Sequence, residues 1–179
     1  MARNFTLTFA RANAYALALV IPILIFYLVP YGGIYGWKSM VSDLLLFFTN
    51  IPLLLGSFIV GTAFHELIHA ISWSLFDGIP WKKVHFGFKW STFTPYVHCP
   101  EPVEVTNYRW GVAMPGIVLG LLPYLFALIL QNGWLLGFGL FFTLAASGDL
   151  LILWLLKNVP SGTLVQDHPD LVGCRVFGE

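Results

Sequence analysis

Four long apolar runs dominate the sequence, and they predict four membrane-spanning helices. The runs cover approximately residues 12–30, 44–76, 112–130 and 134–156. A helix needs about 20 apolar residues to cross the hydrocarbon core of a bilayer, and each run reaches or approaches that length. The pattern therefore predicts an all-α polytopic membrane protein in which shorter polar segments connect the spans.

The second apolar run is longer than one straight span requires. As a straight helix it would measure about 50 Å, against about 30 Å of hydrocarbon. Pro52 predicts a kink near its start, and its last turns are expected to emerge into the cytoplasm. Gly78 and Pro80 are stop signals that end this helix.

The longest polar segment, residues 81–107, predicts a short cytoplasmic β-hairpin between helices two and three. From 83 to 90 polar and apolar residues alternate strictly, which is typical of a half-buried strand. Residues 93–99 are expected to return beside it, with Pro95 suited to an edge strand. Two roles remain open for the hairpin. It would bind an unwound substrate along its free edge, or it would only close the cytoplasmic mouth of the protein.

Composition supports a membrane protein. Hydrophobic residues make up 58% of the chain and charged residues 10%, whereas a soluble domain carries about 25% charged residues. The formal net charge is zero, so there is no basic excess for binding nucleic acid. Without a linker or an internal repeat, residues 1–179 are expected to form a single domain.

The distribution of positive charge predicts the orientation. Arg3 and Arg11 precede the first apolar run, and Lys82, Lys83 and Arg109 lie in or beside the predicted hairpin. The positive-inside rule places these segments in the cytoplasm, together with the tail at 158–179. The protein is thus expected in the cell membrane with both termini cytoplasmic. A signal peptide at the first run is disfavoured because the run is long and no small-residue cleavage site follows it.

One apolar helix carries the main chemical signal. His65, Glu66 and His69 form the pattern H-E-x-x-H, in which the two histidines project from the same helix face. This spacing lets both imidazoles bind one metal ion, with Glu66 placed to accept a proton from a water that the metal activates. Two surface histidines beside a surface glutamate would give the same pattern, but the flanking residues here are apolar. Ionisable residues at membrane depth are functional by default.

Asp149 is the expected third ligand. It is the one acidic or histidine side chain in the four predicted spans that lies outside helix two. Counted from the cytoplasmic helix ends, His65 lies about 18 Å deep and Asp149 about 12 Å deep, a difference that closes if helix two protrudes by one turn. A catalytic zinc site uses three protein ligands and one open position, so His65, His69 and Asp149 predict a Zn²⁺ site. The alternative for Asp149 is a hydrogen-bonded packing residue between helices.

These motifs resemble known membrane metalloproteases. The stretch His65–His69 and the later Gly148-Asp149 resemble the site-two protease class of intramembrane metalloproteases. Residues 55–175 more closely resemble a group of small bacterial membrane proteins described as zincin peptidases, which share the HELIHA stretch and the Ser147-Gly-Asp149 segment. The resemblance implies a zinc-dependent peptidase with four helices. The chain departs from the site-two pattern where an Asn-Pro-Asp-Gly type of motif is reduced to Gly148-Asp149.

A second metal site is a weaker hypothesis. His98, Cys99, His168 and Cys174 are metal-ligating residue types in the segments expected in the cytoplasm. Their spacings are unspecific, so hydrogen bonds that tie the tail to the hairpin are the favoured explanation. Two cysteines are also too few for a disulfide framework.

We therefore expect a zinc-dependent intramembrane peptidase with Glu66 as general base. Its expected partners are a membrane protein or peptide substrate and the lipid bilayer, and the sequence indicates no oligomeric state. The alternative is a catalytically inactive metal-binding membrane protein that regulates or binds a partner. A metal transporter is disfavoured because no relay of acidic or histidine residues leads to either surface.

Overall fold

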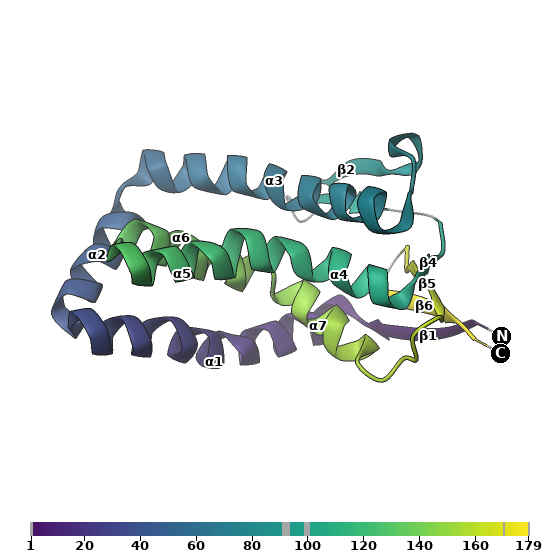
Figure 1. The fold of residues 1–179 in the computed structure, drawn as a ribbon, viewed down its shortest axis with the longest axis horizontal. Coiled ribbons are helices and arrows are strands. Elements are labelled where there is room, and N and C mark those ends of the chain that lie inside the picture. Colours follow the sequence, from purple (N-terminus) through teal and green to yellow (C-terminus); the bar gives the residue numbers. More distant parts are fainter. Residues whose placement is uncertain (1, 91–93, 99–100, 170, 179) are drawn as a thin grey trace. The chain divides into compact units, whose positions relative to one another are not determined.

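The computed structural model is mostly helical, with small antiparallel sheets (Figure 1). It describes residues 2–90, 94–98, 101–169 and 171–178. The helices are α1 (Phe9–Tyr35), α2 (Trp37–Thr49), α3 (Ile51–Asp77), α4 (Val105–Pro115), the π-helical turn η2 (Gly116–Leu121), α5 (Leu122–Leu130), α6 (Gly133–Ala145) and α7 (Ser147–Leu156). The strands are β1 (Ala2–Leu7), β2 (His85–Lys89), β3 (Thr94–His98), β4 (Val103–Glu104), β5 (Leu164–Asp167) and β6 (Val172–Phe177), and a short 3₁₀ turn, η1, covers Trp81–Lys83.

The apolar helices agree with a membrane protein. Three helical stretches are long and apolar enough to cross a bilayer: Phe9–Tyr35, Ile51–Asp77 and Val105–Leu130. There are four if α6 and α7 together form one span. The described residues therefore contain three to four candidate spans, which agrees with the apolar pattern of the sequence.

The chain forms two compact units. The first comprises Met1–Tyr15, Ala63–Pro115 and Gly148–Glu179, and it contains every described strand together with α4 and the C-terminal part of α3. The second comprises Ala16–Thr62 and Gly116–Ser147.

A four-stranded antiparallel sheet in the first unit joins distant parts of the chain. The strand order is β1-β6-β5-β4. Ala2 pairs with Phe177, and Val103 pairs with Val165. The sequence pattern predicts no strand in the N-terminal segment or in the tail, so this sheet is an addition to the predicted all-α fold. β5 reads Leu-Val-Gln-Asp and β6 reads Val-Gly-Cys-Arg-Val-Phe, and neither alternates strictly between apolar and polar residues.

The predicted hairpin is present, with narrower bounds. β2 and β3 pair antiparallel, with His85 opposite His98. Residues 93 and 99, the expected ends of the return strand, lie outside the described residues. The rest of the predicted segment differs, because β4 pairs with β5 and α4 already begins at Val105. Glu104 starts α4 by accepting hydrogen bonds from the N–H groups of Thr106 and Asn107, which is the function of an N-cap.

The predicted kink in the second helix is a complete break. α2 ends at Thr49 and α3 begins at Ile51, and the intervening Asn50 has a non-helical ψ of 81°. The Asn50 side chain accepts a hydrogen bond from the N–H of Leu53 at 3.2 Å, so it caps α3. Pro52 fits the first turn of the new helix, where a missing N–H is harmless.

The predicted turn after the third span is present, but the predicted fourth helix is broken. Gln131 has a left-handed φ of 51° after α5, and the Asn132 side chain caps α6 by accepting from the N–H groups of Trp134 and Leu135. The break lies at Ala146, whose ψ of 10° ends α6. Because α7 starts directly afterwards, Asp149 lies in its first turn.

Tyrosine hydroxyls in the second unit are hydrogen-bonded within its apolar core. Tyr27 bonds to Thr143 at 2.5 Å, and Tyr124 donates to the carbonyl of Phe26 at 2.9 Å. Polar groups in an apolar environment are costly unless they are paired, so these bonds allow tyrosines to pack among the leucines of this core.

Candidate metal centre

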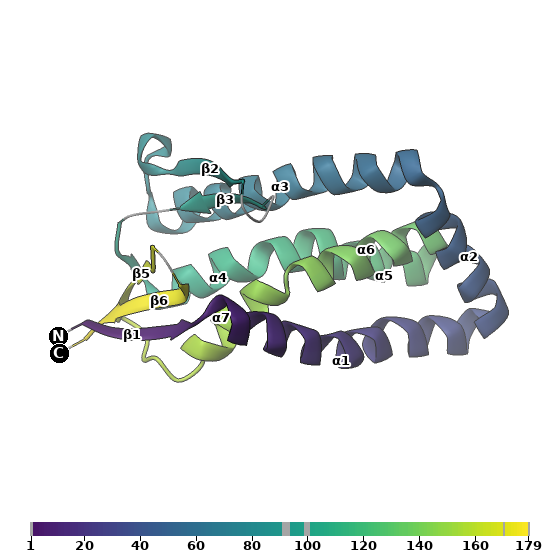
Figure 2. The same cartoon turned by 180° about the vertical axis from the view of Figure 1, so that it is seen from behind.

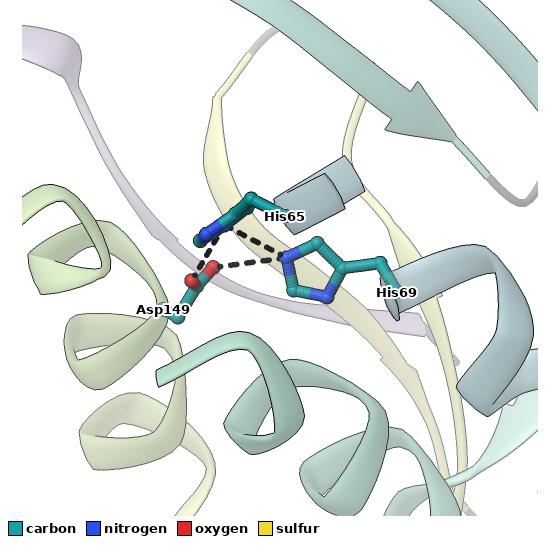
Figure 3. Close-up of side chains that lie close together, drawn as sticks. All are labelled: His65, His69 and Asp149. Atoms are coloured by element: carbon teal, nitrogen blue, oxygen red, sulfur yellow. Dashed lines mark hydrogen bonds and ion pairs between the residues drawn. The ribbon is translucent and has the colours of Figure 1, made fainter. Parts of the chain in front are cut away.

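His65 and His69 lie on the same face of α3, one turn apart, as the H-E-x-x-H spacing predicts. Their Nε2 atoms are 3.3 Å from each other. Figure 3 shows both rings turned toward one point, where the Asp149 side chain meets them. The α-helical period alone produces this geometry, because residues i and i+4 project from the same face.

Asp149 approaches the two histidines from α7. Its Oδ2 lies 3.2 Å from His65 Nε2, and its Oδ1 lies 3.6 Å from His69 Nε2. The ligand atoms of the three residues all lie within 4.8 Å of one another. The break at Ala146 contributes here, because a carboxylate in the first turn of a helix is stabilised by the positive end of the helix dipole.

A backbone carbonyl fixes the orientation of His69. His69 Nδ1 lies 3.0 Å from the carbonyl oxygen of Gly111 on α4. A carbonyl can only accept, so Nδ1 carries the proton, and in the neutral ring Nε2 has a free lone pair. Trp73 stacks on the other side of the ring, with centroids 5.8 Å apart. A Cβ at position 111 would lie 2.8 Å from Trp73 Nε1, so the close approach needs glycine.

The three residues fit a zinc ion. In a tetrahedral site with bonds of about 2.0–2.1 Å, ligand atoms are roughly 3.3 Å apart. The two Nε2 atoms lie 3.3 Å apart and His65 Nε2 lies 3.2 Å from Asp149 Oδ2, which is close to that spacing. His69 Nε2 lies 3.6 Å from the other carboxylate oxygen, Oδ1. Asp149 Oδ2 is buried and has no hydrogen-bond partner among the described residues, as expected of an atom that binds a cation. Two imidazoles and one carboxylate form a donor set typical of catalytic zinc.

Glu66 is held by the hairpin. Its Oε2 accepts a hydrogen bond from the backbone N–H of Val97 on β3 at 2.9 Å. Figure 2, the view from behind, shows β3 beside α3. This N–H points away from β2, so Val97 and the residue opposite to it, Phe86, exchange no backbone hydrogen bonds. The pair Phe88 and Pro95 lies two positions on and is of the same kind, which explains how β3 accommodates a proline.

The residues of the second, weaker metal-site hypothesis make contacts that agree with hydrogen bonds between the tail and the hairpin. His98 Nδ1 on the hairpin lies 3.5 Å from Asp167 Oδ2 in the tail, and Tyr108 donates a hydrogen bond to the same carboxylate. Burial raises the pKa of Cys174 to about 12, so its sulfur is a protonated thiol at neutral pH and a poor ligand. His168 Nδ1 accepts from the N–H of Leu171. Cys99 lies outside the described residues.

Sequence reasoning missed two contributors to this centre, the carbonyl of Gly111 and the N–H of Val97. Every residue has these backbone groups, so neither leaves a side-chain signal. The position of Gly111 at the start of an apolar run was the available hint, since a glycine there allows close approach of a bulky ring.

The comparisons with known proteins agree with this centre. Residues 58–164 match a family described as "Putative zincin peptidase". The match includes His65, Glu66, His69 and Asp149. No curated protein and no solved structure matches the chain. Because the matched segment is more than half of the sequence, the chain belongs to this zincin peptidase family.

Proposed function

We propose that the protein is a zinc-dependent intramembrane peptidase that hydrolyses peptide bonds of membrane-associated substrates. The observation that carries this proposal is the convergence of His65, His69 and Asp149. Two of these residues lie on a helix apolar enough to span a membrane, and the zincin family supplies the reaction class. The resemblance to site-two proteases supports the same activity.

Strand pairing supports four spans. β1 and β6 come from opposite ends of the chain and pair with each other, which supports a topology with both termini on one side of the membrane. The pairing of β4 with β5 adds the segment between α3 and α4 to that side. The chain then crosses the membrane an even number of times between β1 and β4, and again between β4 and β5. This supports counting α6 and α7 as one span. With positive residues inside, that side is the cytoplasm.

The residues divide the chemistry among them. His65, His69 and Asp149 would hold the ion, which when bound supplies a Lewis acid that polarises a peptide carbonyl and acidifies water. The Gly111 carbonyl keeps the Nε2 lone pair of His69 available for the ion. Glu66 is the general base and takes the proton of the attacking water. Its bond to Val97 engages Oε2 and leaves Oε1 for that proton.

The hairpin has a part in substrate handling under this proposal. A transmembrane helix must unwind before it can be cleaved, and its freed backbone groups then need hydrogen-bond partners. The outer edge of β3 lies beside Glu66, so a substrate strand added to this edge would pass the general base.

Removal of metal is the direct test of the proposal. Treatment of the purified protein with a zinc chelator is expected to abolish cleavage of membrane peptides, and added zinc should restore it. Metal content is measured on the same samples, so that loss of cleavage is matched to loss of zinc. Full cleavage by a metal-free sample would overturn the proposed mechanism.

The orientation gives a second prediction. Cys174 is fully buried, so natural thiols are poor topology probes, and exposed lysines at opposite ends of the spans are better positions. In a Cys99→Ser background, Lys38→Cys should react with an impermeant thiol reagent in intact cells. Lys82→Cys should react only after permeabilisation. The reverse pattern would invert the proposed orientation.

One observation favours a second candidate, a metal-binding regulator without peptidase activity. The Glu66 carboxylate is engaged by the hairpin backbone, and a general base must exchange that bond or share it with water. If the hairpin never releases or shares Glu66, the protein binds zinc and a partner but cleaves nothing.

A further inference from the structure

Arg109 on α4 binds the C-terminal end of α7. Its Nη2 donates hydrogen bonds to the carbonyl of Leu156, the last residue of α7, and to the carbonyl of Val159 at 2.6 Å. The last carbonyls of a helix have no partner inside the helix. A cation there also interacts favourably with the helix dipole, so Arg109 is a side-chain cap for α7.

The cap is made at an energetic cost. Arg109 Nε is buried and has no hydrogen-bond partner among the described residues, and leaving a buried donor without a partner is unfavourable. The guanidinium nevertheless takes this position, where Nη2 reaches two carbonyls at once. Lysine could place one ammonium there but has no planar fork.

The opposite end of the same helix carries the candidate ligand. Asp149 lies in the first turn of α7 and Arg109 caps the last turn. Asp149 lies about 10 Å along the helix from the capped end, so a tilt of roughly 5° that starts at that end displaces Asp149 by about 0.9 Å. Zinc–ligand distances in real sites agree within about 0.2 Å, so a small tilt is enough to disturb this ligand.

α4 contacts His69 and α7 from neighbouring positions. The Gly111 carbonyl orients His69, and Arg109, two residues earlier, fixes the helix that carries Asp149. Both contacts originate from one short stretch of one helix, so that stretch contacts both His69 and the helix that carries Asp149.

We infer that Arg109 is a positioning residue for the metal centre, acting through α7 on Asp149. The inference rests on the proposed zinc site. It assigns to Arg109, which contacts the end of α7 opposite to Asp149, the role usually filled by a hydrogen-bond partner next to a ligand. Loss of such partners typically lowers metal affinity about 10- to 100-fold.

The test compares three variants of the full-length purified protein by zinc affinity. Arg109→Gln is expected to bind zinc about 10- to 100-fold more weakly than wild type, and Arg109→Lys should fall between the two. Lys157→Gln is the matched control. Lys157 is a cation at the same end of α7, but its ammonium lies over the Trp154 ring, 5.0 Å from the centroid. This variant should bind zinc within about twofold of wild type.

A spectroscopic measurement separates positioning from loss of stability. Cobalt(II) bound in place of zinc reports the ligand geometry through its visible absorption, so the Arg109→Gln spectrum should change in shape, whereas the Lys157→Gln spectrum should not. Wild-type affinity and spectrum in Arg109→Gln would overturn the inference. Equal losses in Arg109→Gln and Lys157→Gln would also overturn it, because they would reflect charge alone. Absence of zinc binding by the wild type would instead contradict the proposed metal site.

Discussion

Replacing Asp149 with alanine is expected to lower the zinc affinity of the purified protein by more than about 100-fold. This exceeds the usual effect of losing an outer-shell partner, because the change removes one of three ligands. Two histidines at 3.3 Å would remain, which leaves the site short of the set that zinc requires. Zinc retained after dialysis against a metal buffer is the measurement, and His69→Ala should show a loss of similar size.

Asp43 provides the matched control for this experiment. It is a half-buried aspartate on α2 whose carboxylate accepts a hydrogen bond from Tyr31 at 3.3 Å, so it is a packing carboxylate of the kind that Asp149 would be under the alternative hypothesis. Asp43→Ala should keep its zinc. If Asp149→Ala also keeps its zinc, Asp149 is a packing residue and the proposed centre is wrong.

Replacing Glu66 with glutamine is expected to leave zinc binding intact and to lower the rate of peptide cleavage about 10²- to 10⁴-fold. That range is the usual contribution of a general acid or base. The amide cannot take a proton from water at neutral pH, but its oxygen can still accept the hydrogen bond from Val97 N–H. The variant therefore tests proton transfer while the contact to the hairpin is preserved. Zinc content and turnover of a membrane peptide are measured on the same preparation.

The outcome separates the two candidate functions. Equal inactivity of wild type and Glu66→Gln on a broad panel of membrane peptides, with zinc bound in both, would favour the regulator over the peptidase. Equal activity of both proteins would show that another group accepts the proton.

The sequence predicted the parts of this protein that depend on side-chain chemistry. Length and apolarity indicated the helical stretches, because hydrocarbon thickness sets the length of a span. His65, His69 and Asp149 were found together because ionisable groups at membrane depth are rare. The structure brings these three side chains within 4.8 Å of one another, and their role as zinc ligands stays a prediction.

The parts that the sequence did not predict depend on the backbone. The break at Ala146 puts Asp149 in the first turn of a helix, but no proline stands at that point to indicate it. The carbonyl of Gly111 and the N–H of Val97 act through groups that every residue has. Strand pairing is likewise invisible when the partners, such as β1 and β6, are separated by almost the whole chain.

The pairing of β1 with β6 also means that this sheet can be completed only late in biosynthesis. The first strand leaves the ribosome without its partner, and it must wait until the last strand has been made. Asp167, which contacts the hairpin through His98, arrives equally late. The contact between His98 and Asp167, which joins the hairpin to the tail, is therefore made only by the finished chain. A nascent or prematurely terminated copy carries His65, Glu66 and His69, but it lacks the tail residue that contacts the hairpin.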